Sequence, residues 1–488
     1  MATRIHLKII AGVVLLASSA RYALPQSASE HRPIEVSSQA GAAPAPSEKA
    51  SEQEMAGLVK LPGTPAQPSV PTQTPSAYSR FVEPTNGLTE NEIVRYALAH
   101  NGDLLAARQM IAEARGRLRQ AGFRTNPMVD GGYQHGITSN DNNLNLSAEL
   151  PLELGGRRDA RVAVAQREIE LREAEVADFE RKLAADVRMK CVNVTAAARN
   201  LKFTEDLLRL TRDSHRLVQA RVNRGKSAPL EQNLVFVEVN RVDTMRINFE
   251  GKAEVALLEL RKVIGMPPGE PLQLKGEFDI NRQPQPQSDA SRTALASRPD
   301  LVAARAAENL ALAQIEQSRT EGKVDASIFA SYTRQNMGFG VRGINDTGAL
   351  APVQGVFHYV GVGIKLSLPV RNKNQGNIEA AQAQLEAARN RREFAQNVVL
   401  NEVASAYARF LRAREALGVY RDAVHNQAER NLDVIRQTYE VGQRSLIDYV
   451  AEQRRFIDIE TGYTDVLKEY FDSLVEIERA APSPVPTT

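Results

Sequence analysis

Two short polar turns, each built around one glycine, hold the residues whose types and spacing could do chemistry. Glu440, Arg444 and Asp448 surround Gly442, the second of these glycines. If several copies of the chain share one axis, one carboxylate per chain becomes a ring, and carboxylate rings select cations. In such a ring, Glu440 and Asp448 would be the candidates to gate a cation path, with Arg444 as a latch. Ser445 is also a residue type suited to a helix N-cap, and Asp448 would then lie in the first turn of the helix. The gate interpretation and the cap interpretation are compatible.

The remaining inventory argues against catalysis and against a resident metal. A single cysteine, Cys191, excludes an internal disulfide framework and any multi-cysteine metal site. The histidines show no i, i+4 pairing, and the chain lacks H-E-x-x-H, G-x-S-x-G and P-loop motifs. We therefore expect no enzyme activity and no cofactor. Lys+Arg total 61 and Asp+Glu total 59, and this balance argues against a nucleic-acid partner.

Two segments alternate between apolar and polar residues, which is a strand signal. They are Asn143–Leu150 and Val360–Leu368, and we expect Met128–Ile137 and Asp325–Gln335 to pair with them in two hairpins. At about 10 residues, such strands are long enough to cross a bilayer when tilted. The alternative is one half-exposed sheet of a soluble domain. In a membrane barrel the polar residues would line the lumen, namely Asn143, Asn145, Ser147, Glu149, Lys365 and Ser367.

Long helices surround the predicted hairpins. Two proline-free stretches, residues 152–228 and 370–481, show the 3–4 spacing of apolar residues that is typical of coiled-coil seams. A helix of about 65 residues would be ~100 Å long. Each stretch is interrupted near its glycine, Gly225 or Gly442. Returning helices are expected over Glu231–Ile264 and Leu446–Arg479, and shorter opening helices over Asn91–Gly122 and Ala294–Gly322.

The chain contains two copies of this plan, with the landmarks in the same order. ALAHNGDLLAAR corresponds to ALASRPDLVAAR, LPLELGGRR to LPVRNKNQG, and RVNRGKSAPLEQN to TYEVGQRSLIDYV. The second copy carries extra residues between the first two landmarks, in a glycine-rich stretch, NMGFGVRGINDTGALAPVQG. We expect the copies to occupy residues 88–270 and 291–480, with residues 271–290 as a linker between them.

The amino terminus has the pattern of a cleaved secretory signal. Arg4 and Lys8 precede the apolar run IIAGVVLLA and a group of small residues, so we expect a signal peptide over residues 1–23. Residues 24–87 are rich in Pro, Ala and Ser and are expected to form a disordered linker. Residues 481–488 are expected to form a disordered tail.

The predicted strands require partner chains if they enter a membrane. Four strands cannot close a barrel, since the smallest common barrels have about 8. Open strand edges in hydrocarbon leave unpaired N–H and C=O groups, and each costs several kcal/mol. A long α-hairpin also needs neighbours for its apolar seam. Both arguments predict a symmetric oligomer, and physics alone leaves two, three or four chains open.

The duplicated plan, the two strand-to-helix joints and the second tip resemble the TolC family of outer-membrane efflux proteins, from about Leu88 to Ala480. The joint LPVRNKNQG is most similar to the CzcC and CusC heavy-metal branch. The resemblance implies a mainly α fold with a membrane β part, in which three chains build a 12-stranded barrel on an α-helical tunnel through the periplasm. It also implies a periplasmic adaptor and an inner-membrane pump of the resistance–nodulation–division (RND) type. The adaptor would dock at the tips, on Arg224, Gly225, Lys226, Ser227, Gly442, Gln443 and Ser445.

The resemblance therefore implies a passive exit duct for heavy-metal cations, in the outer membrane and in contact with its lipid. A duct for drugs or for type I secretion would have the same fold and stays an alternative. A soluble periplasmic coiled-coil adaptor is a remoter one, because an adaptor carries one α-hairpin and a lipoyl-like domain, whereas this chain carries two hairpins in tandem.

Overall fold

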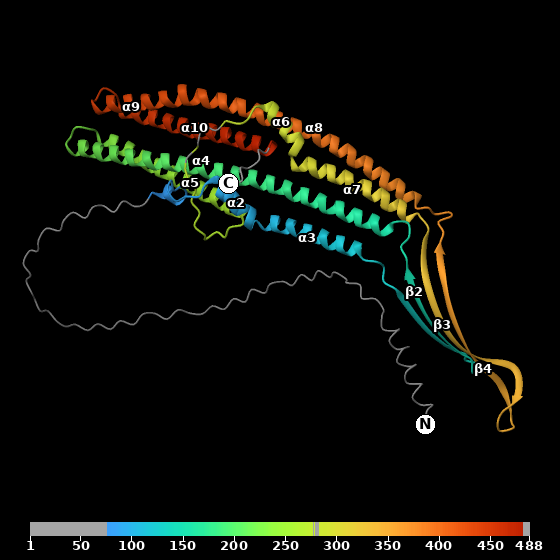
Figure 1. Ribbon diagram of the computed structural model, residues 1–488. Coiled ribbons are helices and arrows are strands. Elements are labelled where there is room, and N and C mark those ends of the chain that lie inside the picture. The colour runs from blue at the N-terminus through green and yellow to red at the C-terminus, as the bar shows by residue number, and fades with distance from the viewer. Residues whose placement is uncertain (1–75, 277, 279–282, 482–488) are drawn as a thin grey trace, which may run out of the picture. The chain divides into compact units, whose positions relative to one another are not determined.

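The computed structural model describes residues 76–276, 278 and 283–481 (Figure 1). The predicted signal peptide, most of the predicted linker 24–87 and nearly all of the predicted tail lie outside the described residues. The described chain is mainly helical and holds one small antiparallel sheet, as the sequence predicts. Across these residues, no helix combines the length and the apolar character that a membrane span requires.

The first copy begins with α2 (Glu90–His100) and α3 (Gly102–Gly122). α2 starts at a capping box, in which Thr89 and Glu92 each accept a hydrogen bond from the other's backbone N–H. A hairpin of β1 (Met128–His135) and β2 (Asn142–Pro151) follows. The chain then forms α4 (Arg157–Asn223), a helix of 67 residues, and returns through α5 (Pro229–Ile264).

The second copy repeats this order with α6 (Gln287–Ser297), α7 (Pro299–Glu321), β3 (Asp325–Ile344) and β4 (Leu350–Ser367). Its outgoing helix has three parts, which are α8 (Gln375–Val419), a π-helical turn η2 (Tyr420–His425) and α9 (Asn426–Glu440). The returning helix is α10 (Leu446–Ala480).

The opening segments differ from the single helices that the periodicity predicts. Each is broken at one residue in an extended conformation, Asn101 with φ −64° and ψ 120°, and Arg298 with φ −65° and ψ 126°. Pro299 explains the second break, because the residue before a proline is disfavoured in the α region. Asn101 instead becomes the N-cap of α3, since its side chain accepts a hydrogen bond from the backbone N–H of Leu104 at 2.9 Å.

The four strands form one antiparallel sheet in the order β1-β2-β3-β4 (Figure 1). The hairpins pair as the sequence predicts, and β2 joins them by pairing with β3 from Asn142↔Asn336 to Pro151↔Ser327. The glycine-rich stretch lengthens the second hairpin beyond the predicted strand end at Gln335, as far as Ile344↔Leu350, with a register shift between Gly338 and Arg342.

The glycines of this extension have a spacing that suggests a nucleotide site, but their setting excludes one. Gly338, Gly340 and Gly343 match the G-x-G-x-x-G pattern. A dinucleotide site needs that pattern between a strand and a helix, where the glycines let the backbone approach a pyrophosphate. Here the three residues lie inside one long antiparallel strand, so the pattern carries no nucleotide chemistry.

The apolar seams of the long helices are buried, as their spacing predicts. α4 contacts α5, α7 and α10, and α8 contacts α7 and α10, so the two copies pack together along α4. Burial of these seams removes apolar surface from water and holds the copies side by side. The buried seam residues are Ile169, Val176 and Leu183 on α4, and Val399, Val403, Ala406 and Phe410 on α8.

Both predicted linkers are partly structured. Within residues 76–87, a 3-10 helix, η1 (Ala77–Arg80), leads to Phe81 and Val82, which are buried with α2 and α5. Within residues 271–290, Leu274 bridges to both Val82 and Leu88, and α6 already begins at Gln287. These few apolar residues are too isolated in the sequence to show helical or strand periodicity. The composition of the two segments therefore predicts linkers.

Candidate channel wall and hairpin tips

The strand register gives the sheet one apolar face and one polar face. Residues that pair directly across antiparallel strands lie on the same face. Leu146 pairs with Tyr332, which pairs with Val360, and the same alternation continues along the sheet. Val360 and Val362 are 82% and 80% exposed, so no described residue of the chain covers this apolar face. A contiguous apolar surface of this kind marks a membrane or protein contact.

The six lumen candidates lie together on the polar face. Asn145 accepts a hydrogen bond from Thr333 Oγ1 at 3.1 Å. The Glu149 carboxylate accepts a hydrogen bond from Ser327 Oγ at 2.5 Å, and its other oxygen lies 3.4 Å from Lys365 Nζ. β3 thus brings an acid of β2 and a base of β4 into one ion pair. Asn143, Ser147 and Ser367 share the face through their pairs Gln335, Ser331 and Asp325.

Arginines of the first joint anchor the passage from helix to strand. The Arg157 guanidinium donates to the carbonyls of Glu321 and Lys323 at 3.0 and 2.9 Å, and pairs with Asp325 at 3.0 Å. Arg158 Nε donates to the carbonyl of Gly122 at 2.7 Å. Carbonyls at a helix C-terminus lack helical partners and carry partial negative charge, so arginine suits them. These side chains fix the ends of α7 and α3 against the start of α4.

The second joint uses close backbone contact instead. Asn374, at φ 62°, donates from its side-chain amide to the Ser318 carbonyl at 2.8 Å. A β-carbon at Gly322 would lie 2.3 Å from the Lys373 carbonyl oxygen, so this position requires glycine. Both joints therefore contact the C-terminal end of α7.

The two tips are the predicted glycine turns. Gly225 and Gly442 adopt φ 67° and 80°, the left-handed region that favours glycine at a helix C-terminus. Their backbone N–H groups donate to the carbonyls of Val222 and Tyr439, at 2.9 and 3.0 Å. The first tip holds Arg224, Lys226 and Ser227, and the second holds Glu440, Gln443, Arg444, Ser445 and Asp448.

Among the tip residues, Ser445 and Asp448 form the capping box of α10. The Asp448 N–H donates to Ser445 Oγ, and the Ser445 N–H donates to the Asp448 carboxylate, both at 3.2 Å. The Glu440 carboxylate accepts a hydrogen bond from Arg436 at 3.2 Å, one turn earlier in α9. The cap interpretation of Asp448 is therefore confirmed, and the gate interpretation stays a prediction.

The structure also joins the two tips, which the sequence did not predict. Arg221 of α4 donates to the Glu440 backbone carbonyl at 3.1 Å, and its guanidinium lies 5.8 Å from the centre of the Tyr439 ring. Tyr439 stacks on Tyr449 of α10 at 5.7 Å between ring centres. Burial is the main reason that the pKa of Tyr439 is raised above its ordinary value. Polar residues on a charged helix face carry no signal that would identify their partners in another helix.

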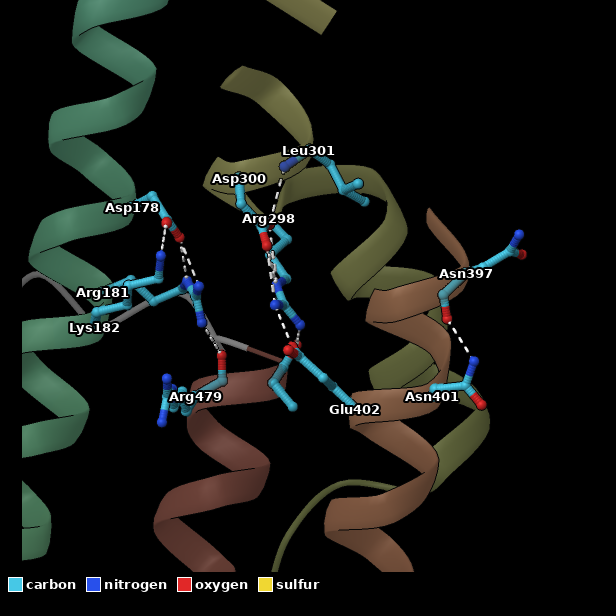
Figure 2. Close-up of polar contacts among 11 residues, drawn as sticks. Asp178, Arg181, Lys182, Arg298, Asp300, Leu301, Asn397, Asn401, Glu402 and Arg479 are labelled. Carbon is cyan, nitrogen blue, oxygen red and sulfur yellow. Dashed lines mark hydrogen bonds and ion pairs between the residues drawn. The ribbon is translucent and has the colours of Figure 1, made fainter. Parts of the chain in front are cut away.

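Each helix break anchors the end of its returning helix. Asn101 Nδ2 donates to the Val263 carbonyl in the last turn of α5 at 2.8 Å. Arg298, 3% exposed, stands at the equivalent place and donates to the Ala480 carbonyl at the end of α10 at 3.2 Å (Figure 2). It also pairs with Asp300 at 2.9 Å and with Glu402 of α8.

A second arginine reaches the same helix end from α4. Arg181 donates to the Arg479 carbonyl and pairs with Asp178 at 2.6 Å (Figure 2). Burial opposes ionisation of Asp178, but hydrogen bonds and charge from Lys182 and Arg181 outweigh it and hold its pKa below the ordinary value. The carboxylate is therefore stabilised in the folded chain, and α10 is fixed from both copies.

No resident metal centre is visible in the part of the chain that the structure describes, since no three His, Cys, Asp or Glu side chains gather there. The half-buried His425 instead pairs with Glu460 of α10, which also lies 3.6 Å from Arg199 of α4. This contact sits at the π-helical turn, where one extra residue per turn shifts the register of the helix face.

Several known proteins are similar to this chain in sequence or in fold. The chain is 23% identical over 410 residues to the cobalt-zinc-cadmium resistance protein CzcC of Cupriavidus metallidurans, covering 81% of this chain and 90% of the relative. A crystal structure of CusC matches with a TM-score of 0.65 at 18% identity, over 86% of this chain and 99% of that one. The Campylobacter jejuni CmeC outer membrane channel matches with a TM-score of 0.64 at 15% identity, over 80% and 85%.

The fold is thus that of the outer-membrane channels, a strand pair in each of two copies set on long α-hairpins. The model of the outer membrane efflux protein family matches residues 93–266 and 290–481. The chain belongs to the outer membrane efflux protein family. It is a passive efflux protein of the outer membrane and not an enzyme.

Proposed function

We propose that three copies of this chain form the outer-membrane exit duct of a tripartite efflux system for heavy-metal cations. The four strands of each copy would contribute to a 12-stranded barrel, and the paired helices would form a tunnel into the periplasm. A periplasmic adaptor and an inner-membrane RND pump would complete the system. The copies of the repeat are taken as residues 88–270 and 291–480.

The main support for this proposal is the sheet, which has one apolar face, one polar face and two open edges. In the described chain, β1 pairs only with β2 and β4 pairs only with β3. Open edges beside an exposed apolar face are unstable in lipid until they are paired. Head-to-tail pairing of β1 with the β4 of a second copy would satisfy both edges and place the polar faces around one lumen.

The polar face and the second tip would control what passes. In a trimer the Glu149–Lys365 pair would recur around the lumen, so this level would carry paired charges. Glu440 and Asp448 would form acidic rings at the periplasmic end, with Arg444 beside them. The adaptor would dock on both tips, at Arg224, Gly225, Lys226, Ser227, Gly442, Gln443 and Ser445.

The metal substrate is supported by similarity to CzcC and CusC. A drug or protein duct would have the same fold, and CmeC and other outer-membrane channels are also similar. A strain that lacks the gene decides between them. We expect it to become sensitive to divalent heavy-metal salts and to keep its resistance to organic toxins, and the reverse result would refute the metal assignment.

The duct itself is tested with purified full-length protein in planar lipid bilayers. We expect a detergent-stable trimer that conducts, and a Glu440→Ala/Asp448→Ala variant with weaker block by divalent cations. The matched control removes two exposed acids farther along α9, Glu429→Ala/Asp433→Ala, and should leave the block unchanged. Equal block in the wild-type protein and the tip variant would remove the gate assignment, and a monomer without conductance would refute the duct.

A further inference from the structure

Toward the hairpin turns, polar side chains interrupt the apolar face of the sheet. On β4, Leu366, Ile364, Val362 and Val360 follow one another along this face. The next residue of the face is His358, which pairs across the strands with Arg334 of β3. A group of polar side chains from neighbouring cross-strand pairs, here called the polar row, therefore follows the apolar band of β4 directly.

The polar row is held together by its own hydrogen bonds. Tyr332 OH lies 2.9 Å from His358 Nδ1, and Arg334 Nη1 donates to Asn142 Oδ1 at 3.3 Å. Asn142 pairs in turn with His135 of β1. Both histidines remain exposed. The row thus presents a fixed guanidinium and two imidazoles from three different strands on one surface.

The sign of charge differs between the two faces of the sheet. Within the four strands, which are described in full, the apolar face carries Arg334, Arg342 and the two histidines but no carboxylate. The carboxylates of the strands, Asp130, Glu149 and Asp325, lie on the polar face. Asp141, in the β1–β2 turn, accepts a hydrogen bond from the Gly338 N–H at 2.7 Å. The outward-facing row therefore favours an anion.

We propose that this row, His135, Asn142, Tyr332, Arg334 and His358, binds the phosphate group of an outer-leaflet lipid. The proposal rests on the proposed function, since it requires the apolar face to meet hydrocarbon. With the helices extending into the periplasm, the hairpin turns face outward, and the row lies at the depth of the outer headgroups. Guanidinium forms strong, directional hydrogen bonds with phosphate, and tyrosine suits this interface.

A lipid fits better than a free phosphate because the row continues directly into the apolar band. A phosphate at Arg334 places the attached acyl chains over Val360 and Val362, the most exposed residues of that band on β4. Burial of these side chains by acyl chains adds hydrophobic free energy that a free ion cannot supply. The site therefore recognises an amphiphile, with charge and apolar surface in adjacent places.

Native mass spectrometry of the purified full-length oligomer tests this. The protein is titrated in detergent with bis-phosphorylated lipid A, dephosphorylated lipid A, phosphatidylcholine and inorganic phosphate. We expect retention of lipid A that depends on its phosphates, and a loss of affinity of about fivefold for Arg334→Gln, the effect of one cation near an anionic lipid surface. The control Arg342→Gln removes an equal charge farther along β3 and should bind as the wild-type protein does.

The possible outcomes are distinct. Equal retention of phosphatidylcholine, or an unchanged affinity in Arg334→Gln, overturns the proposal and leaves the row as an ordinary polar rim. Competition by inorganic phosphate at the same concentration as the lipid also overturns it, in favour of a free-anion site. If the oligomer conducts in bilayers of phosphatidylcholine but shows no preference for phosphorylated lipid, only this inference fails; without an oligomer or conductance, the proposed function fails.

Discussion

Arg298 offers the sharpest test of how the end of α10 is held. Its guanidinium is 3% exposed and donates to the Ala480 carbonyl while it pairs with Asp300 and Glu402. A hydrogen bond to a charged group contributes about 1.5–3 kcal/mol, and a buried one is costly to lose. We therefore expect Arg298→Leu to make local opening of the last turn of α10 easier by about 2 kcal/mol.

Hydrogen–deuterium exchange of the full-length protein, followed at the peptide that contains residues 474–481, measures this opening. A change of 2 kcal/mol corresponds to exchange about 30-fold faster. Glu402 is half-exposed, so Glu402→Gln removes a surface pair worth at most about 1 kcal/mol and should accelerate exchange no more than about fivefold. Asn101→Ala should loosen the end of α5 and leave α10 unchanged. If Arg298→Leu and Glu402→Gln accelerate exchange equally, the carbonyl anchor is not what holds the helix end.

Three further predictions concern the joint, the tip and the helix packing. Gly322→Ala should reduce the thermal stability and yield of the oligomer, because the new β-carbon would meet the Lys373 backbone carbonyl. The control Gly116→Ala places its β-carbon in open space within α3 and should be neutral or stabilising by up to about 1 kcal/mol. Ser445→Ala should speed amide exchange in the first turn of α10 about fivefold, because it removes a cap of about 1 kcal/mol. Ser227→Ala should not speed exchange in the first turn of α5, which no side chain caps. Equal effects of the two variants would contradict the assignment of Ser445 as the N-cap. Asp178 has a lowered pKa in the folded chain, so its contribution to stability is present at neutral pH and is lost as the pH falls through that lowered value. Asp178→Asn should therefore lower the melting temperature at neutral pH, and the difference should shrink as the pH is lowered through and below the ordinary range of an aspartate; a difference that persists until the protein unfolds in acid would refute the charge argument.

The sequence predicts the elements of this fold well because their periods are strong and long. The 3–4 spacing of apolar residues identifies α4 and α8, and the alternation in Asn143–Leu150 identifies the face that each strand residue occupies. The duplicated landmarks also predict the equivalence of the two glycine turns, which the positive φ of Gly225 and Gly442 confirms. These signals come from local geometry, which repeats along the chain.

Contacts between distant charged residues could not be predicted in the same way. Arg157 looks like an ordinary helix start, yet it binds carbonyls at the end of α7. Arg221 and His425 lie in charged helical runs, where any of several faces could have been solvated. The extension of β3 was missed because glycines lower strand propensity, although the ladder to β4 tolerates them. Asn101 and Arg298, at the breaks of the opening helices, are an exception. They occupy the same place in the duplicated motif, so their equivalent roles could have been predicted from the sequence.

The two copies solve one structural problem with different chemistry. Each must hold the last carbonyls of a returning helix against the break between its opening helices, and a short amide does this in the first copy, where Gly265 brings the backbones close. In the second copy a long guanidinium does the same and reaches α8 as well. Because an arginine fork can satisfy a carbonyl and two carboxylates together, the second anchor connects three helices where the first connects two. At the free end of the second hairpin, α10 is capped and the turn closes on Gly442. The two tips are held together there by the Arg221 contact and by a buried apolar cluster that includes Val218, Val235 and Leu446.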